Sequence, residues 1–368
     1  MLSFKTEIKL NNKQRTMMAK HAGVARHAYN WGLAITKEIL DYNQANPENK
    51  LKFPSAIDLH KRLVAEVKSV CPWYYQVSKC SPQQALRDLR MAWDRCFKKT
   101  SKTPTFKKKG QKDSFYLEGN IQIKGNKIKL PKIGWVKIYE KSIPPILIKT
   151  SGSNCVISKR ADKWFISYKV DHTPEVVDQP LGIVGVDIGI KTLATLSSGV
   201  IFPGLKAYRM AKKRLAFLQR SLSRKVKSSA NYKKAQKQLA KLHYRISCIR
   251  KDAIHQLTHY LTHNHSEIVI EDLNISGMLK NHRLASAIAD CGFYEFRRQL
   301  EYKSQWYGSI LHIVDRWFPS SKTCSSCGEI KSALKLSDRT FNCNHCGLSI
   351  DRDLNASLNL CNAVSSIV

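Results

Sequence analysis

The stretch LGIVGVDIGIKTLATLSSGV, residues 181–200, decides the fold of the second half of the chain. It opens with a nearly continuous apolar run that ends on Asp187, a pattern typical of a buried strand ending in a carboxylate. A second short strand and a Ser-Ser-Gly turn follow. The run SEIVIEDLN, residues 266–274, repeats the arrangement, because its apolar segment ends on Glu271 and Asp272. The sequence therefore predicts two buried strands that each deliver an acidic side chain.

The order of the elements around these strands indicates an α/β fold. From residue 181 the pattern predicts three short strands, a helical insert, a strand, a helix over 291–308, a strand over 309–314, a cysteine-rich insert and a last helix. This is the element order of a ribonuclease-H-like fold, in which the first and fourth strands lie side by side. Asp187 and Glu271 should then converge. The last helix, from SIDRDLNASLNL (349–360), could place a third aspartate beside them.

The charge of the chain selects polyanionic partners. Its 368 residues carry 62 Lys and Arg against 28 Asp and Glu, a formal net charge of +34. Such a field favours nucleic acids, with a membrane surface as the weaker reading. No stretch reaches the roughly 18 apolar residues that a membrane span needs. The start MLSFKTEIKLNNKQ also lacks the apolar core of a signal peptide, so we expect a cytoplasmic, nucleoid-associated protein.

Three converging carboxylates would repel one another unless a divalent cation neutralised them. Hard oxygen ligands favour Mg²⁺ or Mn²⁺. Two such ions, about 3.5 to 4 Å apart, activate water and stabilise the leaving oxygen in phosphodiester hydrolysis. A single acidic residue at a strand end is usually only a solvated terminus, whereas three in this order on so basic a chain favour a metal site.

A second metal site is predicted from cysteine spacing. Four cysteines form C-x₂-C-x₁₅-C-x₂-C, and a glycine follows each pair; they are Cys324, Cys327, Cys343 and Cys346. This spacing is typical of a structural Zn²⁺ site with four thiolate ligands, which holds a fold and does not catalyse. His345 lies between the last two cysteines and is expected to be exposed. The other seven cysteines are interpreted as core thiols.

The sequence pattern of the first half of the chain differs from that of the second half. A strand at FKTEIKL (4–10) precedes helices that extend to about residue 99, and short strands between 115 and 170 indicate an antiparallel sheet or small barrel. A basic segment joins them, and a basic helical hairpin is predicted over 206–251. Each could lie against phosphates or simply be solvated. The candidate nucleic-acid contacts are Lys107, Lys108, Lys109, Lys212, Lys213, Arg214, Arg224 and Lys225.

Four motifs resemble the RuvC-like nuclease and zinc-ribbon motifs of the TnpB family. They are GVDIGIKTLATLSSG, IVIEDLNISGM, PSSKTCSSCG and FNCNHCGLSIDRDLNAS, and they fall within residues 181–362. TnpB proteins are encoded by transposons and are relatives of the type V CRISPR effectors. Weaker likeness extends to GVARHAYNWGL and TPTFKKKGQKDSF in the first half.

The resemblance implies an RNA-guided, Mg²⁺-dependent DNA endonuclease. A guide RNA made from the transposon end would direct cleavage of matching double-stranded DNA. The catalytic metal ligands would be Asp187, Glu271 and Asp353, with Asp353 preferred over Asp351 because the family's ligand stands two residues before an asparagine, here Asn355. That asparagine could orient a ligand or water, and Asp351 and Asp272 could act as outer-shell groups.

The resemblance also implies a domain plan. Residues 1–10 and 101–180 would form a barrel-like wedge, and 11–100 an inserted helical recognition lobe of helix-turn-helix type. Residues 181–319 and 349–368 would form the RuvC-like domain, with the zinc ribbon at 320–348. The guide–target duplex would lie in a basic channel between the lobes, held through its backbone.

Two other functions remain open from the sequence. The same carboxylates could move strands in a transposase or recombinase, because ribonuclease-H-like folds serve both chemistries. Alternatively, a chain with an inactive centre could act as a zinc-containing nucleic-acid-binding regulator. Strand-joined products would favour the transposase, and indifference to Asp187→Ala would favour the regulator.

Overall fold

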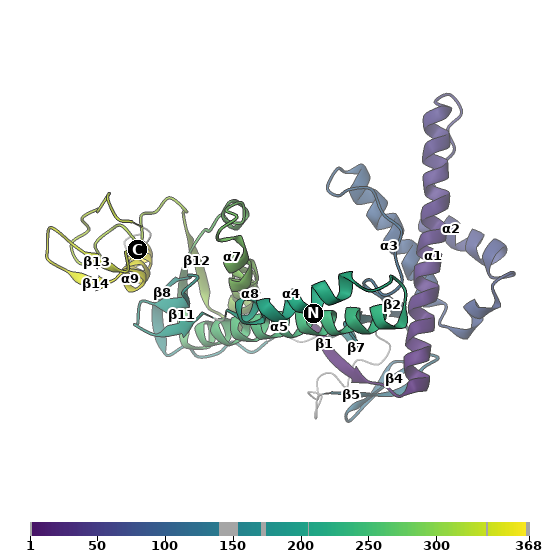
Figure 1. Ribbon diagram of the computed structural model, residues 1–368, viewed down its shortest axis with the longest axis horizontal. Helices are drawn as coiled ribbons and strands as arrows, with labels where there is room; N and C mark the ends of the chain where they lie inside the picture. Colours follow the sequence, from purple (N-terminus) through teal and green to yellow (C-terminus); the bar gives the residue numbers. More distant parts are fainter. Residues whose placement is uncertain (1, 140–153, 171–173, 205, 336–337, 366–368) are drawn as a thin grey trace. The chain divides into compact units, whose positions relative to one another are not determined.

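The computed structural model describes residues 2–139, 154–170, 174–204, 206–335 and 338–365. The chain divides into two compact units, Met1–Thr173 and Pro174–Val368, which are taken in turn (Figure 1). Parts of the predicted wedge (residues 1, 140–153 and 171–173), ribbon (336–337) and nuclease domain (205 and 366–368) lie outside the described residues. The four-domain plan therefore stays a prediction. No helix in the described ranges is both long and apolar enough to cross a bilayer.

The first unit contains a seven-stranded antiparallel sheet in the order β2-β6-β7-β1-β5-β4-β3. Its strands are β1 (Leu2–Lys9), β2 (Ser114–Leu117), β3 (Gln122–Lys124), β4 (Lys127–Leu130), β5 (Gly134–Ile138), β6 (Cys155–Arg160) and β7 (Lys163–Val170). The strand that precedes the helices thus pairs with strands that follow them. Among the described strands β2 and β3 are edges, so the expected closure into a barrel is not seen there.

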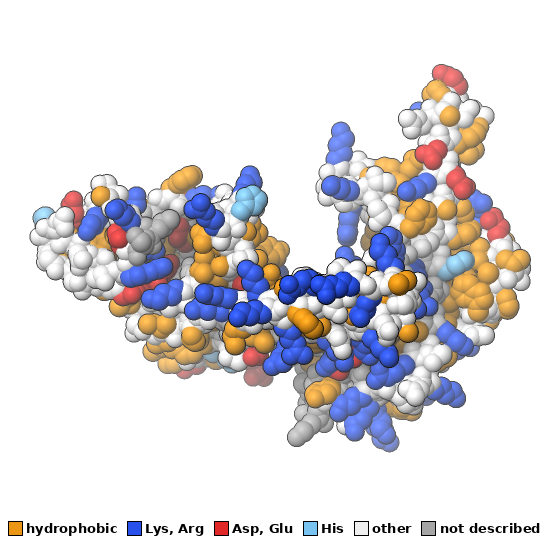
Figure 2. All heavy atoms as spheres, in the orientation of Figure 1, with side chains coloured by type: hydrophobic (Ala, Val, Ile, Leu, Met, Phe, Trp, Pro, Cys, Tyr) orange, Lys and Arg blue, Asp and Glu red, His pale blue; other side chains and the backbone are white. Residues whose placement is uncertain are grey.

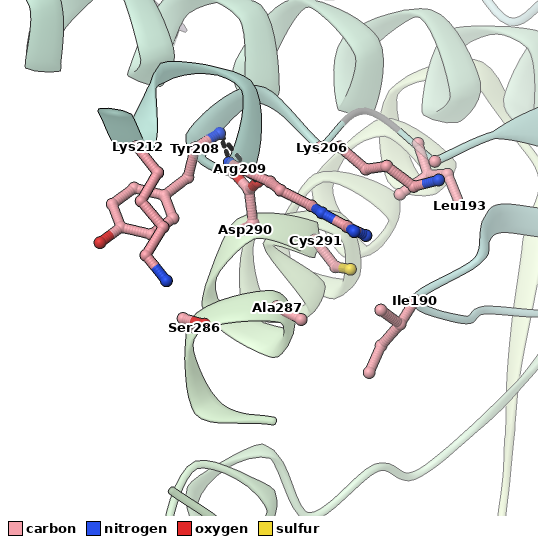
Figure 3. Close-up of a pocket in the computed structure, with 11 residues that line it drawn as sticks. Ile190, Leu193, Lys206, Tyr208, Arg209, Lys212, Ser286, Ala287, Asp290 and Cys291 are labelled. Atoms are coloured by element: carbon pink, nitrogen blue, oxygen red, sulfur yellow. Dashed lines mark hydrogen bonds between the residues drawn. The ribbon is translucent and has the colours of Figure 1, made fainter. Parts of the chain in front are cut away.

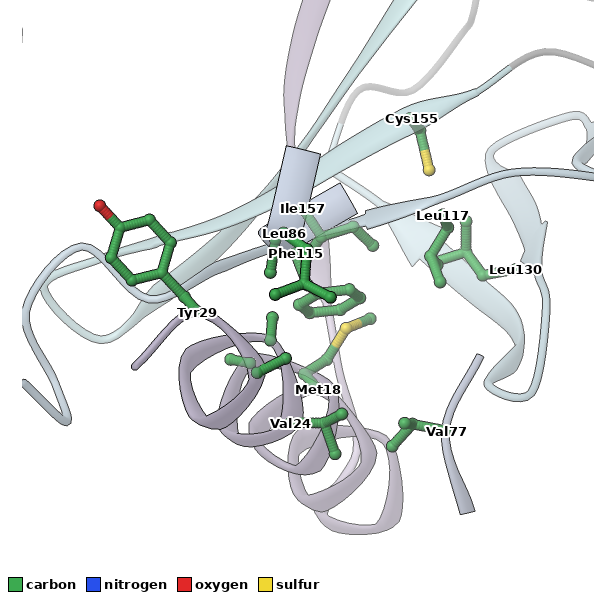
Figure 4. Packing of buried hydrophobic residues seen from close by; sticks show 14 of the residues in the cluster. Met18, Val24, Tyr29, Val77, Leu86, Phe115, Leu117, Leu130, Cys155 and Ile157 are labelled. Carbon is green, nitrogen blue, oxygen red and sulfur yellow. The ribbon is translucent and has the colours of Figure 1, made fainter. Parts of the chain in front are cut away.

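The helices of this unit are α1 (Asn12–Ala45), α2 (Ala56–Arg62), the π-helical turn η1 (Leu63–Val67), the 3₁₀ turn η2 (Pro72–Gln76) and α3 (Cys80–Phe97). Asn11 begins α1 with a capping box, in which its side chain and that of Gln14 each accept from the other's backbone N–H. Gly32 allows α1 and α3 to approach closely, since a Cβ there would lie 2.8 Å from Leu86 Cδ2. The core between these helices and the sheet is shown in Figure 4.

The second unit is built on a five-stranded sheet in the order β10-β9-β8-β11-β12. Its strands are β8 (Leu181–Asp187), β9 (Thr192–Leu196), β10 (Ile201–Pro203), β11 (His265–Glu271) and β12 (Ile310–Val314). β9 pairs antiparallel with both β10 and β8, whereas β11 pairs parallel with both β8 and β12. The first and fourth strands therefore lie side by side, which confirms the adjacency expected from the element order.

Helices cover both faces of this sheet. They are α4 (Ala207–Ser223), α5 (Ala230–Asn264), α6 (Ile275–Met278), α7 (Ala285–Cys291), α8 (Phe293–Tyr307) and α9 (Arg352–Ser365). Side chains of α5 and α8 share a core with Val184 and Val186 of β8. Gly185 points to the opposite face, where a Cβ would lie 1.9 Å from the backbone oxygen of Ser357 in α9. This glycine lets α9 lie directly on the strand that ends in Asp187.

The cysteine-rich insert precedes α9. Its two short strands, β13 (Thr340–Asn342) and β14 (Ser349–Asp351), form an antiparallel pair. A small core gathers Phe341, which is fully buried, with Leu334, Leu348, Ile350 and two of the cysteines. Such a core is too small to fold on hydrophobic burial alone, so the insert needs another source of stability.

Candidate active site and zinc ribbon

Two predicted carboxylates lie at the same edge of the second sheet. Asp187 is the last residue of β8 and Glu271 is the last residue of β11. These strands are parallel, and their register pairs Val186 with Ile270, so the two acidic residues that follow are neighbours. The convergence predicted for these two positions is therefore present.

The third carboxylate comes from the first turn of α9. Thr192 Oγ1 lies 3.5 Å from Asp353 Oδ2, which brings the start of β9 to the same place. Asp351 has another task, because its Oδ1 accepts from the backbone N–H groups of Asp353 at 2.9 Å and Leu354 at 3.1 Å. Asp351 thus caps α9, and the capped turn fixes the position of Asp353.

The carboxylates influence one another's charge. Burial raises the pKa of Asp187 to about 7, and the negative charges of Asp353 and Glu271 add to the rise. Burial also raises the pKa of Glu271, with a further contribution from Asp272. Groups that disfavour one another's ionised forms in this way suit a divalent cation, which would relieve the repulsion.

The raised pKa of Asp187 predicts a pH-dependent stability. A carboxyl whose folded pKa lies above its unfolded value of 3.8 stabilises the fold below pH 4, and this stability is lost as pH rises through about 7. In Mg²⁺-free buffer, Asp187→Asn should therefore unfold at a higher temperature than the unchanged chain at pH 8. The gain is at most about 4 kcal/mol and shrinks toward pH 4. Thermal unfolding from pH 5 to 8 measures it, and an asparagine variant that is less stable throughout would contradict it.

Asp272, the neighbour of Glu271, has arginine partners. Its two oxygens accept from Arg297 of α8 and Arg316 after β12. These bonds lower the pKa of Asp272, with Arg316 contributing most. Its backbone N–H donates to Val314 at 2.9 Å. Asp272 thus lies in an arginine clamp that fixes the end of β11, and the outer-shell role suggested for it from the sequence stays a prediction.

The predicted zinc cysteines come together. In the described part of the chain, they are the one group of three or more His, Cys, Asp or Glu placed to share an ion, with their sulfurs within 4.8 Å of one another. Cys324 Sγ lies 3.5 Å from Cys346 Sγ, and Cys327 Sγ lies 3.6 Å from Cys343 Sγ. A Zn²⁺ ion about 2.3 Å from each sulfur requires tetrahedral edges of about 3.8 Å. The set fits Zn²⁺.

The surroundings of the second cysteine pair, Cys343 and Cys346, also favour a thiolate. Backbone hydrogen bonds from Cys346 and His345 lower the pKa of Cys343 to about 6. His345 itself is exposed, as expected. The interpretation of the other seven cysteines as core thiols is confirmed for Cys155, which is buried in the core of the first unit, and Cys71 and Cys96 pack against that core. It is wrong for Cys248, which is exposed, and the remaining three are half-buried. Isolated cysteines carry no periodic pattern that reveals their burial.

Two asparagines of α9 connect the ribbon to the helix that carries Asp353. Asn355 is fully buried; its Oδ1 accepts from Ser325 N at 3.0 Å, and its Nδ2 donates to Thr323 O at 2.7 Å. Asn359, one turn later, donates to Thr323 O at 2.6 Å and to Ser320 O at 2.7 Å. The sequence suggested that Asn355 orients a ligand or water, but its amide is used on the backbone that flanks Cys324.

Replacing Asn355 tests this connection. Asn355→Ala leaves the partly buried backbone N–H of Ser325 unpaired, at about 1 to 3 kcal/mol, whereas Thr323 O keeps its hydrogen bond from Asn359. We expect a lower free energy of unfolding and Zn²⁺ release to a chromogenic chelator at least about tenfold faster, since 1.4 kcal/mol corresponds to a factor of ten. Asn344→Ala, at an exposed position of the same ribbon, is the control. Equal release rates for the two variants would show that the bonds do not support the ribbon.

The candidate nucleic-acid residues lie in two places. Lys107, Lys108 and Lys109 follow α3, where the Lys107 ammonium lies 3.9 Å from the centre of the Tyr29 ring. The others lie on α4 or just after it (Lys212, Lys213, Arg214, Arg224 and Lys225). The basic hairpin is present as α4 and α5, and Figure 2 shows Lys and Arg side chains gathered along it. Their contacts stay predictions.

Three family profiles match this chain. The profile OrfB_IS605, described as "Probable transposase", matches residues 165–282. A "Cas12f1-like, TNB domain" matches residues 293–360, and a "Helix-turn-helix domain" matches residues 1–44.

Curated relatives cover most of the chain. A Streptomyces pristinaespiralis protein named "Putative RNA-guided DNA endonuclease" is 38% identical over 293 residues, which are 77% of this chain and 71% of that protein. Escherichia coli K12 has "Putative RNA-guided DNA endonuclease InsQ", 32% identical over 97% of this chain and 91% of its own length.

Solved structures share the fold. Cas12f1, in a complex with sgRNA and target DNA, is 15% identical with a TM-score of 0.54, over 95% of this chain and 83% of that one. The RNA-guided endonuclease Cas_phi3 is 10% identical with a TM-score of 0.53, over 100% and 92%. The fold and the cysteine cluster thus define a mixed α/β protein with a Cas12f-like fold and a zinc-ribbon-like insert. The identities to the curated relatives show more: the chain belongs to the TnpB family, as the sequence motifs indicated.

Proposed function

We propose that the chain is an RNA-guided, Mg²⁺-dependent DNA endonuclease with a RuvC-like site. The proposal is carried by Asp187 and Glu271, which end neighbouring parallel strands at one sheet edge, and by Asp353, whose negative charge raises the pKa of Asp187. The oxygens of these three carboxylates are not all within the 4.8 Å that separates the ribbon sulfurs. The names of the two curated relatives indicate that the guide is RNA and that the substrate is DNA. In this proposal the protein acts in the cytoplasm, in association with the nucleoid.

Asp187, Glu271 and Asp353 would hold Mg²⁺. When bound there, Mg²⁺ supplies Lewis-acid activation of water and neutralises charge on the phosphate. The chain's own contribution is positioning. The parallel strands fix two of the ligands, the arginine clamp on Asp272 holds the end of β11, and the capped turn of α9 holds the third.

The four ribbon cysteines would hold Zn²⁺ in a structural role. The basic segment after α3 and the hairpin of α4 and α5 would bind the backbones of a guide RNA from the transposon end and of the target DNA. The sheet of the first unit would serve as the wedge and its helices as the recognition lobe. These assignments rest on the charge of the segments and on the family.

The proposal is tested with the protein expressed from its native locus and then purified. RNA that co-purifies is sequenced, and a library of matching double-stranded DNA with randomised flanks is then incubated with the complex and Mg²⁺. The proposal requires discrete RNA and cuts that depend on a match to it. An absence of discrete RNA, or cutting that ignores its sequence, would reject the proposal.

A second candidate, DNA strand transfer, is favoured by the description of the matching profile as a transposase. A transposase would join a cut transposon end to a new strand, whereas an endonuclease leaves free ends. Sequencing the products of the same reaction for joined strands separates the two, and joined strands dependent on Asp187 would favour the second. Binding that persists without any cutting would favour a regulator.

A further inference from the structure

A cavity of about 230 Å³ lies between α4, α7 and the chain around the start of β9. Figure 3 shows Lys206 and Arg209 extending toward the end where Leu193 lies, with Tyr208 and Lys212 at the other end. Most of the lining is apolar. A site of this kind suits a flat, partly apolar ligand with polar groups at its rim.

The cavity shares a wall with the carboxylate site. Ile190 lines it, and Thr192, two residues further along at the start of β9, lies 3.5 Å from Asp353 Oδ2. Cys291 of α7 also lines it, and its Sγ donates to Gly189 O at 3.6 Å. A ligand in the cavity would therefore be adjacent to the loop that follows Asp187.

The rim is cationic. Lys206, Arg209 and Lys212 contribute exposed positive charges. Asp290 is the one carboxylate among the described lining residues, and its oxygens accept from the backbone N–H groups of Tyr208 at 2.8 and 3.0 Å and of Arg209 at 3.4 Å. Because Asp290 caps α4 in this way, it leaves the net charge of the rim positive. Apolar walls with a cationic rim are complementary to a nucleobase and its phosphates.

We propose that this cavity holds one unpaired nucleotide of the DNA strand that is being cut, a ligand class that rests on the proposed function. The base lies against the apolar wall beside Tyr208, and the flanking phosphates contact Arg209 and Lys212. The assignment to the cut strand follows from position, because only that strand must enter the carboxylate edge that shares the wall.

Photo-crosslinking tests the proposal with the full chain bound to its guide RNA. The DNA strand to be cut carries 5-iododeoxyuridine at one position at a time, Mg²⁺ is omitted, and crosslinked residues are identified by mass spectrometry. We expect crosslinks to Tyr208 from one position or two adjacent ones. Ala287→Phe fills the cavity and should lower their yield at least about fivefold, the lower end of the range for a lost base–aromatic stack.

Ala289→Phe is the matched control, because Ala289 is exposed on the same helix and does not line the cavity. If Ala287→Phe lowers the melting temperature, Lys212→Gln serves as the second variant and should also lower the yield. Crosslinks that avoid Tyr208, that survive both variants, or that come from iodouridine in the guide RNA instead would overturn the proposal. If crosslinking gives one of these results while guided cleavage is retained, the nucleotide pocket is rejected and the proposed function stands. Crosslinks to Tyr208 without guided cleavage reject the proposed function alone.

Discussion

Asp187→Ala is expected to lower the rate of guided DNA cleavage by at least about a thousandfold, because it removes a ligand from the proposed Mg²⁺ site, which would contribute several kcal/mol to stabilising the transition state. Its side chain lies at the end of β8 beside Glu271. RNA content and DNA binding should be unchanged. Single-turnover cleavage with a matched guide measures the rate. Filter binding measures how much RNA and DNA the variant still binds.

Asp178→Ala is the control for this experiment, since Asp178 is an exposed acidic residue of the same unit. It should cleave at the rate of the unchanged chain. Cleavage by Asp187→Ala within tenfold of that rate would remove the carboxylate edge from the mechanism. Loss of RNA binding in the same variant would instead assign Asp187 to folding.

Loss of zinc should have the other large effect. Structural Zn²⁺ sites contribute about 10 to 16 kcal/mol of apparent binding energy to the folded state. Cys324→Ser should therefore unfold the ribbon, which has only a small core of its own. Because Asn355 and Asn359 bind the backbone beside Cys324, the start of α9 and Asp353 should lose their support as well. Cleavage should then fall even with excess Mg²⁺.

Elemental analysis, thermal unfolding and limited proteolysis within residues 320–348 check this expectation. Cys248→Ser changes an exposed cysteine outside the ribbon and should keep its zinc, its melting temperature and its activity. A Cys324→Ser protein that retains full zinc and resists proteolysis would show that the ribbon does not depend on the four-sulfur site.

Local sequence patterns were sufficient for the parts of the site that depend on one segment at a time. Apolar runs ending on Asp187 and Glu271 predicted the strands, and known element order predicted their adjacency. The paired cysteines predicted their cluster, because their spacing alone sets the knuckles. The choice of Asp353 over Asp351 came from the family motif, and the structure adds a physical reason in the capping role of Asp351.

Features that depend on distant partners could not be predicted. Asn355 and Asn359 bind backbone more than thirty residues earlier, and no local pattern marks these pairs. The arginine clamp on Asp272 likewise joins three separate elements. Closure of the first sheet into a barrel is not seen among the described strands and stays a prediction, because short alternating strands specify a sheet but not whether its edges meet.

Changing the guide sequence is the most direct test of RNA-guided cleavage by this chain. The purified chain is combined with two RNAs that share the structured part and differ only in the guide segment, and each complex is given the same DNA containing both target sites beside the same flanking motif. We expect the cut to move to the site that matches each guide, and Asp187→Ala to abolish both cuts. Cuts at the same position with either guide would contradict it.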